Sequence, residues 1–286
     1  MNKTERVTWQ GADRRIRCLL LALLAALLLP CAAGADLAVH FIDVGEGDAI
    51  LVLCDGENLL VDAGPAEAGN AVNAYIRKTG LDALNYVIAT HAHDDHLAGM
   101  PDALSGLQVS VVYSSRAIRT TYWVDNVMPR LNQNYMGLLR PEEQESFSLG
   151  NATVTFLDTH ARGDNANDYS LVVRIDYGQT SVLLTADIEG EGEMNLVDSG
   201  APIRADVLKV AHHGGNTSTG EAFLKAVAPR YAVISVGQGN KHGHPHPEPL
   251  VNLEKQNVVV YRTDLDGTVI GTSDGENWTF EVSKAR

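Results

Sequence analysis

The 286-residue sequence is poor in cysteine, with only Cys18, Cys31 and Cys54. Two of the three fall within the first 35 residues, so a chain cleaved after that segment would keep Cys54 alone. A single thiol cannot form an intrachain disulfide, which excludes a small secreted domain held together by disulfides. An exported protein without disulfides is more typical of a bacterial envelope than of the small secreted domains that disulfides stabilise.

Basic residues are also scarce, because 22 Lys and Arg stand against 36 Asp and Glu and give a net charge of −14 at pH 7. Residues 1–35 carry a net charge of +3, so their removal leaves −17 on the remainder. So acidic a chain lacks the basic surface that stable, non-specific coating of nucleic acid requires. A local site in which bound metal ions receive a phosphate group remains compatible with this charge.

Only one long apolar run is present, and it lies near the N-terminus. Three arginines within residues 14–17 precede the uncharged run 18–29, and small residues follow at 33–35. This pattern predicts that residues 1–35 are a signal peptide and that the protein is exported to the periplasm, the extracellular space or the envelope. The alternatives are a lipoprotein with its lipid on Cys31 and an uncleaved membrane anchor, for which the run is barely long enough. Contact with a membrane is expected only through this segment.

The remaining residues, 36–286, suit a single large α/β domain, without a linker or a low-complexity tract. Alternating and β-branched runs predict strands at residues 37–44, 49–54, 59–62, 86–90, 109–113, 152–157, 170–176, 181–185, 205–211, 231–236, 258–262, 268–272 and 278–282. Helices are predicted at residues 66–79, 96–104, 119–139, 189–198, 221–227 and 249–255. The aromatic residues of the third helix, Tyr122, Trp123 and Tyr135, would pack in the core or form a wall over a site. Polar clusters at strand ends suggest two sheets packed face to face, with helices outside and ligands at one edge.

The most distinctive stretch is HAHDDH, residues 91–96, which follows an apolar strand. Its three imidazoles and two carboxylates could not all converge from a regular strand or helix, whereas a tight loop would allow His91, His93, Asp95 and His96 to converge. Imidazole nitrogen and carboxylate oxygen are the ligands that zinc and similar divalent ions prefer. We therefore predict that His91, His93, Asp95 and His96 are metal ligands.

Two later segments supply further candidate ligands. Asp187 ends an apolar strand, where an acid either caps the following helix or, beside a metal loop, bridges two ions. His212 and His213 leave a strand as neighbours and therefore point in different directions. We predict His213 as the ligand, because Gly214 allows the backbone to turn towards the ion. His212 would then either support the metal ligands from behind or face the substrate.

Two divalent ions, zinc or alternatively manganese, would complete a site suited to hydrolysis. His91 and His93 would hold the first ion, the second would be held by Asp95, His96 and His213, and Asp187 would bridge them. Two bridged ions lower the pKa of a shared water towards ~7 and stabilise the charge of a displacement at phosphorus. Asp95 is accordingly counted among the catalytic residues as well as the ligands.

A second histidine-rich loop, HGHPH at residues 242–246, lies near the C-terminus. Because the ligand set is already full, His244 and His246 are predicted to contact the substrate phosphate or to act as general acid. Fortuitous metal affinity of this loop is the alternative. Lys209, on a strand near the site, is predicted either to orient the substrate or to be a charge at the edge of a sheet.

In the order of these motifs the chain resembles the metallo-β-lactamase fold superfamily, whose loop has the pattern HxHxDH. Further segments are similar to the extracellular domain of ComEC-type DNA-internalisation competence proteins, namely residues 41–49 (FIDVGEGDA), 183–189 (LLTADIE), 206–214 (DVLKVAHHG), 243–246 (GHPH) and 261–267 (YRTDLDG). The resemblance covers about residues 37–275. It implies a four-layer αββα sandwich, a two-metal site and a phosphodiester substrate, with DNA as the first expectation.

Three positions depart from this family pattern. Glu46 stands where the competence branch usually has Gln, and His93 is kept where many members have Asp. The usual third histidine of the first ion should fall shortly before Ser170, where this chain has Asn167, a poor zinc ligand. His160 is a nearby alternative for that ligand. Asn167 and Ser170 are expected to face the substrate instead.

The function we expect is that of an exported, metal-dependent hydrolase of phosphodiesters with nuclease-like activity. One alternative is a small-molecule phosphodiesterase resembling a phosphorylcholine esterase of the cell wall, which the charge of −17 favours. Another is a non-catalytic, metal-binding subunit of a DNA-uptake or envelope complex. A true β-lactamase is the least expected, because the resemblance is to the competence branch.

Overall fold

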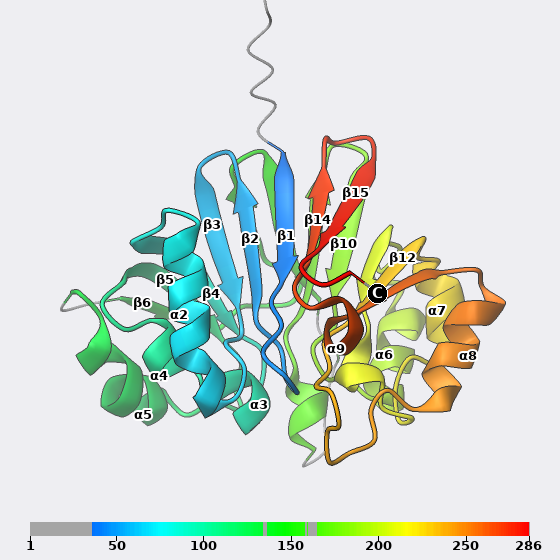
Figure 1. Ribbon diagram of the computed structural model, residues 1–286, viewed down its shortest axis with the longest axis horizontal. Helices are drawn as coiled ribbons and strands as arrows, with labels where there is room; N and C mark the ends of the chain where they lie inside the picture. Colours follow the sequence, from blue (N-terminus) through cyan, green and yellow to red (C-terminus); the bar gives the residue numbers. More distant parts are fainter. Residues whose placement is uncertain (1–35, 134–135, 158, 160–164, 286) are drawn as a thin grey trace, which may run out of the picture. The chain divides into compact units, whose positions relative to one another are not determined.

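Two β-sheets, packed face to face, form the centre of the chain in the computed structural model (Figure 1). The structure describes residues 36–133, 136–157, 159 and 165–285. The segment predicted as a signal peptide, Tyr135 and His160 lie outside the described residues. In the described part of the chain, no helix is both long enough and apolar enough to cross a membrane.

The first sheet has eight strands in the order β15-β14-β1-β2-β3-β4-β5-β6. Neighbouring strands are antiparallel from β15 to β3 and parallel from β3 to β6. Its strands are β1 (Leu37–Phe41), β2 (Ile50–Cys54), β3 (Glu57–Val61), β4 (Ala83–Ala89), β5 (Gln108–Ser114), β6 (Gly137–Leu139), β14 (Val269–Ser273) and β15 (Trp278–Val282).

The second sheet has seven strands in the order β13-β12-β11-β10-β9-β8-β7. It is parallel from β13 to β10 and antiparallel from β10 to β7. Its strands are β7 (Ser146–Leu149), β8 (Ala152–Leu157), β9 (Val172–Tyr177), β10 (Thr180–Leu184), β11 (Val207–Lys209), β12 (Tyr231–Ile234) and β13 (Val259–Arg262).

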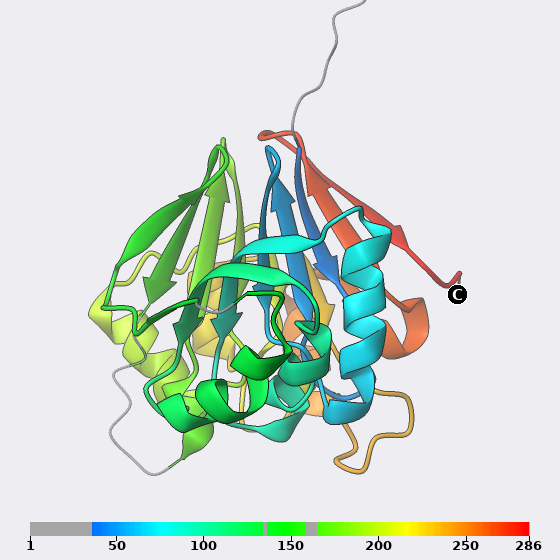
Figure 2. The ribbon, with the colours of Figure 1, turned by 90° about the vertical axis from the view of Figure 1, so that its left-hand side faces the viewer.

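Helices cover the outer faces of both sheets, as Figure 1 and the side view of Figure 2 show. On the first sheet and at its edge are η1 (Ala66–Ala68), α2 (Gly69–Lys78), α3 (Asp94–Leu97), α4 (Met100–Ala103), α5 (Thr120–Tyr122), the π-helical turn η2 (Trp123–Val127) and η3 (Met128–Arg130). The later helices are η4 (Ala166–Tyr169), α6 (Gly190–Ser199), η5 (Ala211–Gly214), α7 (Glu221–Val227), α8 (Pro247–Lys255) and α9 (Thr263–Asp266).

Three apolar clusters hold these layers together. Between the sheets, fully buried side chains such as Phe41 and Val52 of the first sheet pack with Val154 and Val173 of the second. A separate cluster joins α2 and α4 to the outer face of the first sheet, and another joins α6, α7 and α8 to the second. The central strands are therefore buried on both faces, and the predicted four-layer αββα architecture is confirmed.

The helix predicted over residues 119–139 is wrong. The chain instead forms three short helical turns, α5, η2 and η3, and then enters β6. Pro129 lies in η3, and a proline inside a helix removes a backbone donor and clashes with the preceding turn. Trp123 is fully buried, in agreement with the packing role, and its Nε1 donates to Ser114 Oγ (3.0 Å).

Other differences are smaller. The helix predicted over residues 96–104 divides at Gly99 into α3 and α4, and Gly99 packs so closely on the backbone after β3 that a Cβ would collide with the carbonyl oxygen of Ala63. Strand β7 and helix α9 were not predicted, because each has only four residues and lacks a clear period.

Candidate metal centre

The HAHDDH motif lies where β4 ends, at the edge of the sandwich that carries α3 in Figure 1. His91 and His93 occupy the loop, and Asp95 and His96 belong to α3. The Gly-rich turn after β1 closes against this loop, since Asp48 N donates to Asp95 O (3.3 Å). Gly47 permits the approach: its φ is +130°, and a Cβ there would collide with that same carbonyl oxygen.

The predicted ligands fall into two groups that share Asp187. Within each group, the donor atoms all lie within 4.8 Å of one another. One group contains Asp95, His96, Asp187 and His213, and the other contains His91, His93 and Asp187. Asp187 Oδ2 lies 3.2 Å from His96 Nε2, 3.4 Å from His213 Nε2 and 3.7 Å from His91 Nε2. The structure thus brings together all six side chains that were predicted to bind metal.

The donor set is suited to divalent cations. His91 and His96 are fully buried, and Asp187 and His213 are each 1% exposed. Yet His91 Nε2 and Asp187 Oδ1 form no hydrogen bond with any described residue. Polar atoms that are buried without a partner are costly, and a cation between them would supply the missing interaction.

The charges of the cluster also favour a cation at this position. Burial opposes ionisation of His96 and His213, but Asp187 and the other nearby carboxylates outweigh it and raise both pKa values, that of His213 to about 10. For Asp187, burial is likewise outweighed by these two histidines, so its pKa lies well below its ordinary value. Burial and the neighbouring His96 instead lower the pKa of His91. The carboxylates therefore require positive charge, which either protons or metal ions can provide.

Asp62, at the end of β3, supports the ligands from behind. Its Oδ2 lies 2.8 Å from His96 Nδ1, and its two oxygens accept hydrogen bonds from the backbone and the hydroxyl of Thr90 (2.9 and 2.6 Å). Thr90 Oγ1 in turn lies 3.0 Å from His91 Nδ1. Asp62 thereby fixes the ring of His96, and His213 is fixed in the same way through Ser235 O, 2.9 Å from its Nδ1.

Asp48 and Lys209 form a buried ion pair beneath the site. Lys209 Nζ lies 2.7 Å from Asp48 Oδ2. The side chain of Lys209 is 0% exposed and that of Asp48 is 2% exposed. Asp48 Oδ1 also lies 3.8 Å from His213 Nδ1. Lys209 belongs to β11, an interior strand, so it is no edge charge, and a fully buried ammonium has no surface for a substrate. We therefore assign it a positioning role in place of substrate contact.

The three other residues predicted to face the substrate are Asn167, Ser170 and His212. Asn167 and His212 lie beside Glu189, which directly precedes α6, and Ser170 lies beside Asp187. Glu189 Oε1 accepts a hydrogen bond from Asn167 Nδ2 (2.9 Å) and lies 3.4 Å from His212 Nδ1. His212 is half-buried, which lowers its pKa, whereas Asn167 is 5% exposed and its Oδ1 has no hydrogen-bond partner among the described residues. Ser170 is buried and accepts a weak hydrogen bond from Asp187 N (3.4 Å), so it supports the bridging residue more directly than it faces solvent.

The HGHPH loop reaches the site through His244. The centroids of the His244 and His213 rings are 6.2 Å apart, and His244 and His212 are 5.4 Å apart. Glu46 belongs to the Gly-rich turn. Its Oε1 lies 2.8 Å from His244 Nδ1, and its Oε2 accepts a hydrogen bond from Gly237 N (2.9 Å). His246 is farther out and accepts a hydrogen bond at Nδ1 from Asn216 N (3.1 Å).

Sequence reasoning assigned no role in the site to four acids of this region: Glu46, Asp48, Asp62 and Glu189. Asp62 carried a usable signal, because it ends the apolar run LLV much as Asp187 ends LLTA. The other three became identifiable only through contacts between distant segments.

Comparison with known proteins identifies the family of the chain. The sequence model of the Metallo-beta-lactamase superfamily matches residues 42–238. ComE operon protein 3 of Bacillus subtilis (strain 168) is 28% identical over 89% of this chain and 35% of that protein. Recombination protein 2 of Haemophilus influenzae is 30% identical over 81% of this chain and 28% of that protein. The chain therefore spans about a third of the length of these curated relatives.

Solved structures agree on the fold. The metallo-beta-lactamase fold protein YhfI from Bacillus subtilis superimposes with a TM-score of 0.55 at 18% identity, over 83% of this chain and all of that one. CmlA, a diiron beta-hydroxylase from Streptomyces venezuelae, gives a TM-score of 0.54 at 14% identity, over 79% of this chain and 52% of that one. With its motif order, its two-sheet sandwich and a family match over more than half its length, this chain belongs to the metallo-beta-lactamase superfamily.

Proposed function

We propose that the protein is an exported, metal-dependent phosphodiesterase with nuclease-like activity on DNA. The observation that carries the proposal is the pair of donor groups that share Asp187, in which buried atoms of His91 and Asp187 lack partners. A two-ion site bridged by one carboxylate is the arrangement best suited to displacement at phosphorus.

Bound divalent ions would supply an acidified water and would neutralise the charge that develops on the phosphoryl oxygens. His91, His93 and Asp187 would hold one of them, and the four-donor group would hold the other. Asp62 and the carbonyl of Ser235 hold the Nδ1 atoms of His96 and His213, which leaves each Nε2 directed at Asp187.

His244 is the chain's best-placed proton donor for the leaving oxygen. Glu46 holds its Nδ1 side, so the ring is oriented and Nε2 remains available for a substrate. Its ring stands beside those of His212 and His213, at the edge of the ligand cluster, and His246 stands next to it with ring centroids 5.1 Å apart. His212 and Asn167, joined by Glu189, border the site from the other half of the chain and would contact the substrate.

DNA is favoured as the substrate by the resemblance to DNA-internalisation competence proteins and by relatives named Competence protein ComA and Recombination protein 2. The acidic chain favours the alternative, a small phosphodiester such as a phosphorylcholine ester, because a polyanion is repelled by net negative charge. The same substrate assay distinguishes the two.

The test uses the purified protein with zinc or manganese and four substrates: bis-p-nitrophenyl phosphate, linear DNA, p-nitrophenyl phosphorylcholine and nitrocefin. We expect cleavage of the first two, and a preference for phosphorylcholine would favour the alternative. No activity on any substrate, at a metal content near two per chain, would contradict the enzymatic proposal and favour a non-catalytic subunit.

Site variants make the test specific. His93→Ala and Asp187→Ala are expected to lower kcat by at least about 100-fold, because they remove ligands of the ions that stabilise the transition state. His242→Ala is the matched control, since His242 is an exposed histidine of the neighbouring loop and belongs to neither donor group. Activity that survives both ligand substitutions would refute the assignment of the site.

A further inference from the structure

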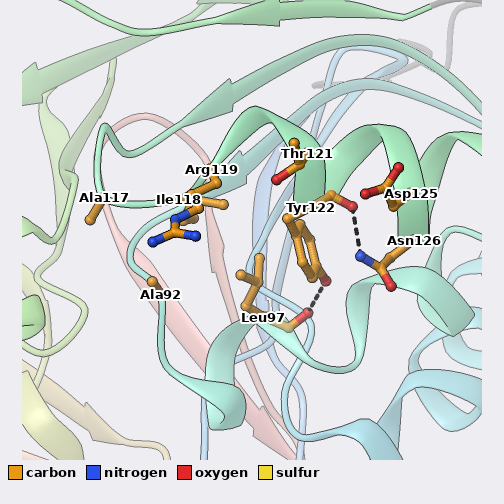
Figure 3. Close-up of a pocket in the computed structure, with 9 residues that line it drawn as sticks. All are labelled: Ala92, Leu97, Ala117, Ile118, Arg119, Thr121, Tyr122, Asp125 and Asn126. Carbon is orange, nitrogen blue, oxygen red and sulfur yellow. Dashed lines mark hydrogen bonds between the residues drawn. The ribbon is translucent and has the colours of Figure 1, made fainter.

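A pocket of about 340 Å³ lies directly beside the HAHDDH loop (Figure 3). Ala92, which stands between His91 and His93, forms part of its wall, so the pocket adjoins the three-donor side of the metal centre. The remaining wall comes mainly from residues 117–126, the segment between β5 and η3. None of the catalytic or ligand residues described above belongs to this segment.

The loop that enters this segment is held firmly in place. Arg140 donates from its guanidinium to the carbonyl oxygens of Ser114 (2.9 Å), Ser115 (2.6 Å) and Ile118 (2.6 Å). Ser115 Oγ donates to Tyr169 O (2.8 Å), which ties the loop to η4, and Ile118 is buried. The backbone that presents the next residue, Arg119, is therefore preorganised.

Arg119 brings an available cation to the pocket. It is exposed and forms no ion pair or hydrogen bond with any described side chain, unlike Arg140, Lys209 and Arg130, which all have partners. Figure 3 shows its guanidinium directed towards Ala92, on the side of the pocket nearest the metal loop. An exposed arginine without a partner in the described part of the chain is available to bind an anionic group of a ligand at this end of the pocket.

The far end of the pocket has a different character. Asp125 and Asn126 lie on the opposite side of Tyr122 from Arg119, as Figure 3 shows. Tyr122 is fixed by its hydroxyl, which donates to Leu97 O (2.6 Å), and Asn126 Nδ2 donates to Tyr122 O (3.0 Å). Asp125 would repel an anion there, so the charge gradient places the anionic group of a ligand at Arg119 alone.

We propose that this pocket is a substrate subsite in which Arg119 binds the phosphate that flanks the scissile phosphodiester. This proposal rests on the proposed phosphodiesterase function and narrows the substrate class to esters that carry a second phosphate, as a nucleic-acid strand does. The subsite lies on the side of the ion held by His91 and His93. The neighbouring phosphate thus reaches a cation without any extended basic surface.

The test compares two substrates that differ by one phosphate: thymidine 5′-(p-nitrophenyl phosphate) with and without a 3′-phosphate. The wild-type protein with zinc is expected to show a higher kcat/KM for the 3′-phosphorylated ester. Arg119→Ala should lower this preference by about five-fold, the value of one charge-assisted contact at an exposed site. Arg116→Ala is the control, because Arg116 is an equally exposed arginine of the same loop that does not line the pocket.

Equilibrium binding keeps this inference separate from catalysis. Calorimetric titration with thymidine 3′,5′-bisphosphate and with thymidine 5′-phosphate should show a tighter Kd for the bisphosphate, and Arg119→Ala should remove most of that difference. An absent preference in the wild type, or equal losses in the Arg116 and Arg119 variants, would overturn the subsite. If bis-p-nitrophenyl phosphate is not hydrolysed at all, the proposed function fails, and the titration still decides whether Arg119 binds a phosphate.

Discussion

The buried pair of Lys209 and Asp48 makes a quantitative prediction about the stability of the site. Lys209→Met keeps most of the volume of the side chain but leaves the carboxylate of Asp48 without its cation. Removing one partner of a buried pair costs ~3–5 kcal/mol, because the remaining charge is poorly solvated. His96 Nδ1 and His213 Nδ1, 3.9 and 3.8 Å from the Asp48 oxygens, offset part of this charge. We therefore expect a loss of about 3 kcal/mol in the free energy of unfolding, a large part of the ~5–15 kcal/mol of a typical domain.

Urea unfolding at pH 7.5 measures this loss, with EDTA present so that metal binding does not contribute to the apparent stability. The double variant Lys209→Met/Asp48→Asn should be more stable than Lys209→Met alone by about 2 kcal/mol, because no unpaired charge remains. Lys225→Met is the control. Lys225 and Glu221 form a pair of similar length (2.6 Å) that is more than half exposed, and its removal should cost less than about 1 kcal/mol.

Two outcomes would refute the reasoning. One is a loss for Lys209→Met no larger than that for Lys225→Met, since burial would then not determine the cost. The other is a double variant less stable than either single variant, since the two side chains would then contribute independently.

Three further predictions concern protons. Zinc binding to the metal-free protein near pH 7 should release about two protons per chain, because His96 and His213 hold protons at this pH that the metal displaces. The variant His213→Ala should release fewer protons. Calorimetry in buffers of different ionisation enthalpy measures the number released. Burial lowers the pKa of His40 to about 4, so its contribution to stability is present above pH ~6.5 and is lost as the pH falls towards 4. Between these pH values the wild type should lose more unfolding free energy than His40→Gln, and urea titrations should show a difference of at most about 3 kcal/mol between the two losses. Glu46→Gln removes the carboxylate that favours protonated His244, so the alkaline limb of the kcat profile should move to lower pH while KM changes little, and an unchanged profile would count against His244 as the proton donor.

The sequence predicted most of the fold because most elements have a strong period or clear end signals. All thirteen predicted strands are present, and α7 has the predicted limits, residues 221–227. The failures lie where local signals are weak or conflict. Good helix formers are a minority in residues 119–139, with Met128, Arg130 and Leu131 among them, and Pro129 interrupts the long helix that was predicted there.

The candidate metal ligands could be predicted from the sequence for a similar reason. His, Asp and His residues at the ends of apolar strands converge because strands of a two-sheet sandwich end at shared edges. The same rule applied to β3 would have found Asp62. It could not find Glu46, because the contact with His244 joins residues 198 positions apart and depends on how the two loops fold over the site.

Asn167 shows how the structure changes the meaning of a sequence signal. In the sequence it was a missing ligand, a position where a histidine was expected. In the structure its Nδ2 is bound to Glu189, which also approaches His212, so the amide belongs to a polar cluster that links η4 to the loop before α6. The hydrogen bond to Glu189 therefore fixes the side chain of Asn167. The two donor groups are therefore unequal, with four donors in the group of His213 and three in the group of His91, and an ion bound on the His91 side would rely more on its substrate or on solvent. The group with fewer donors is the one beside the pocket that contains Arg119, so under the proposed function the ion with the more open coordination would lie where the phosphodiester enters.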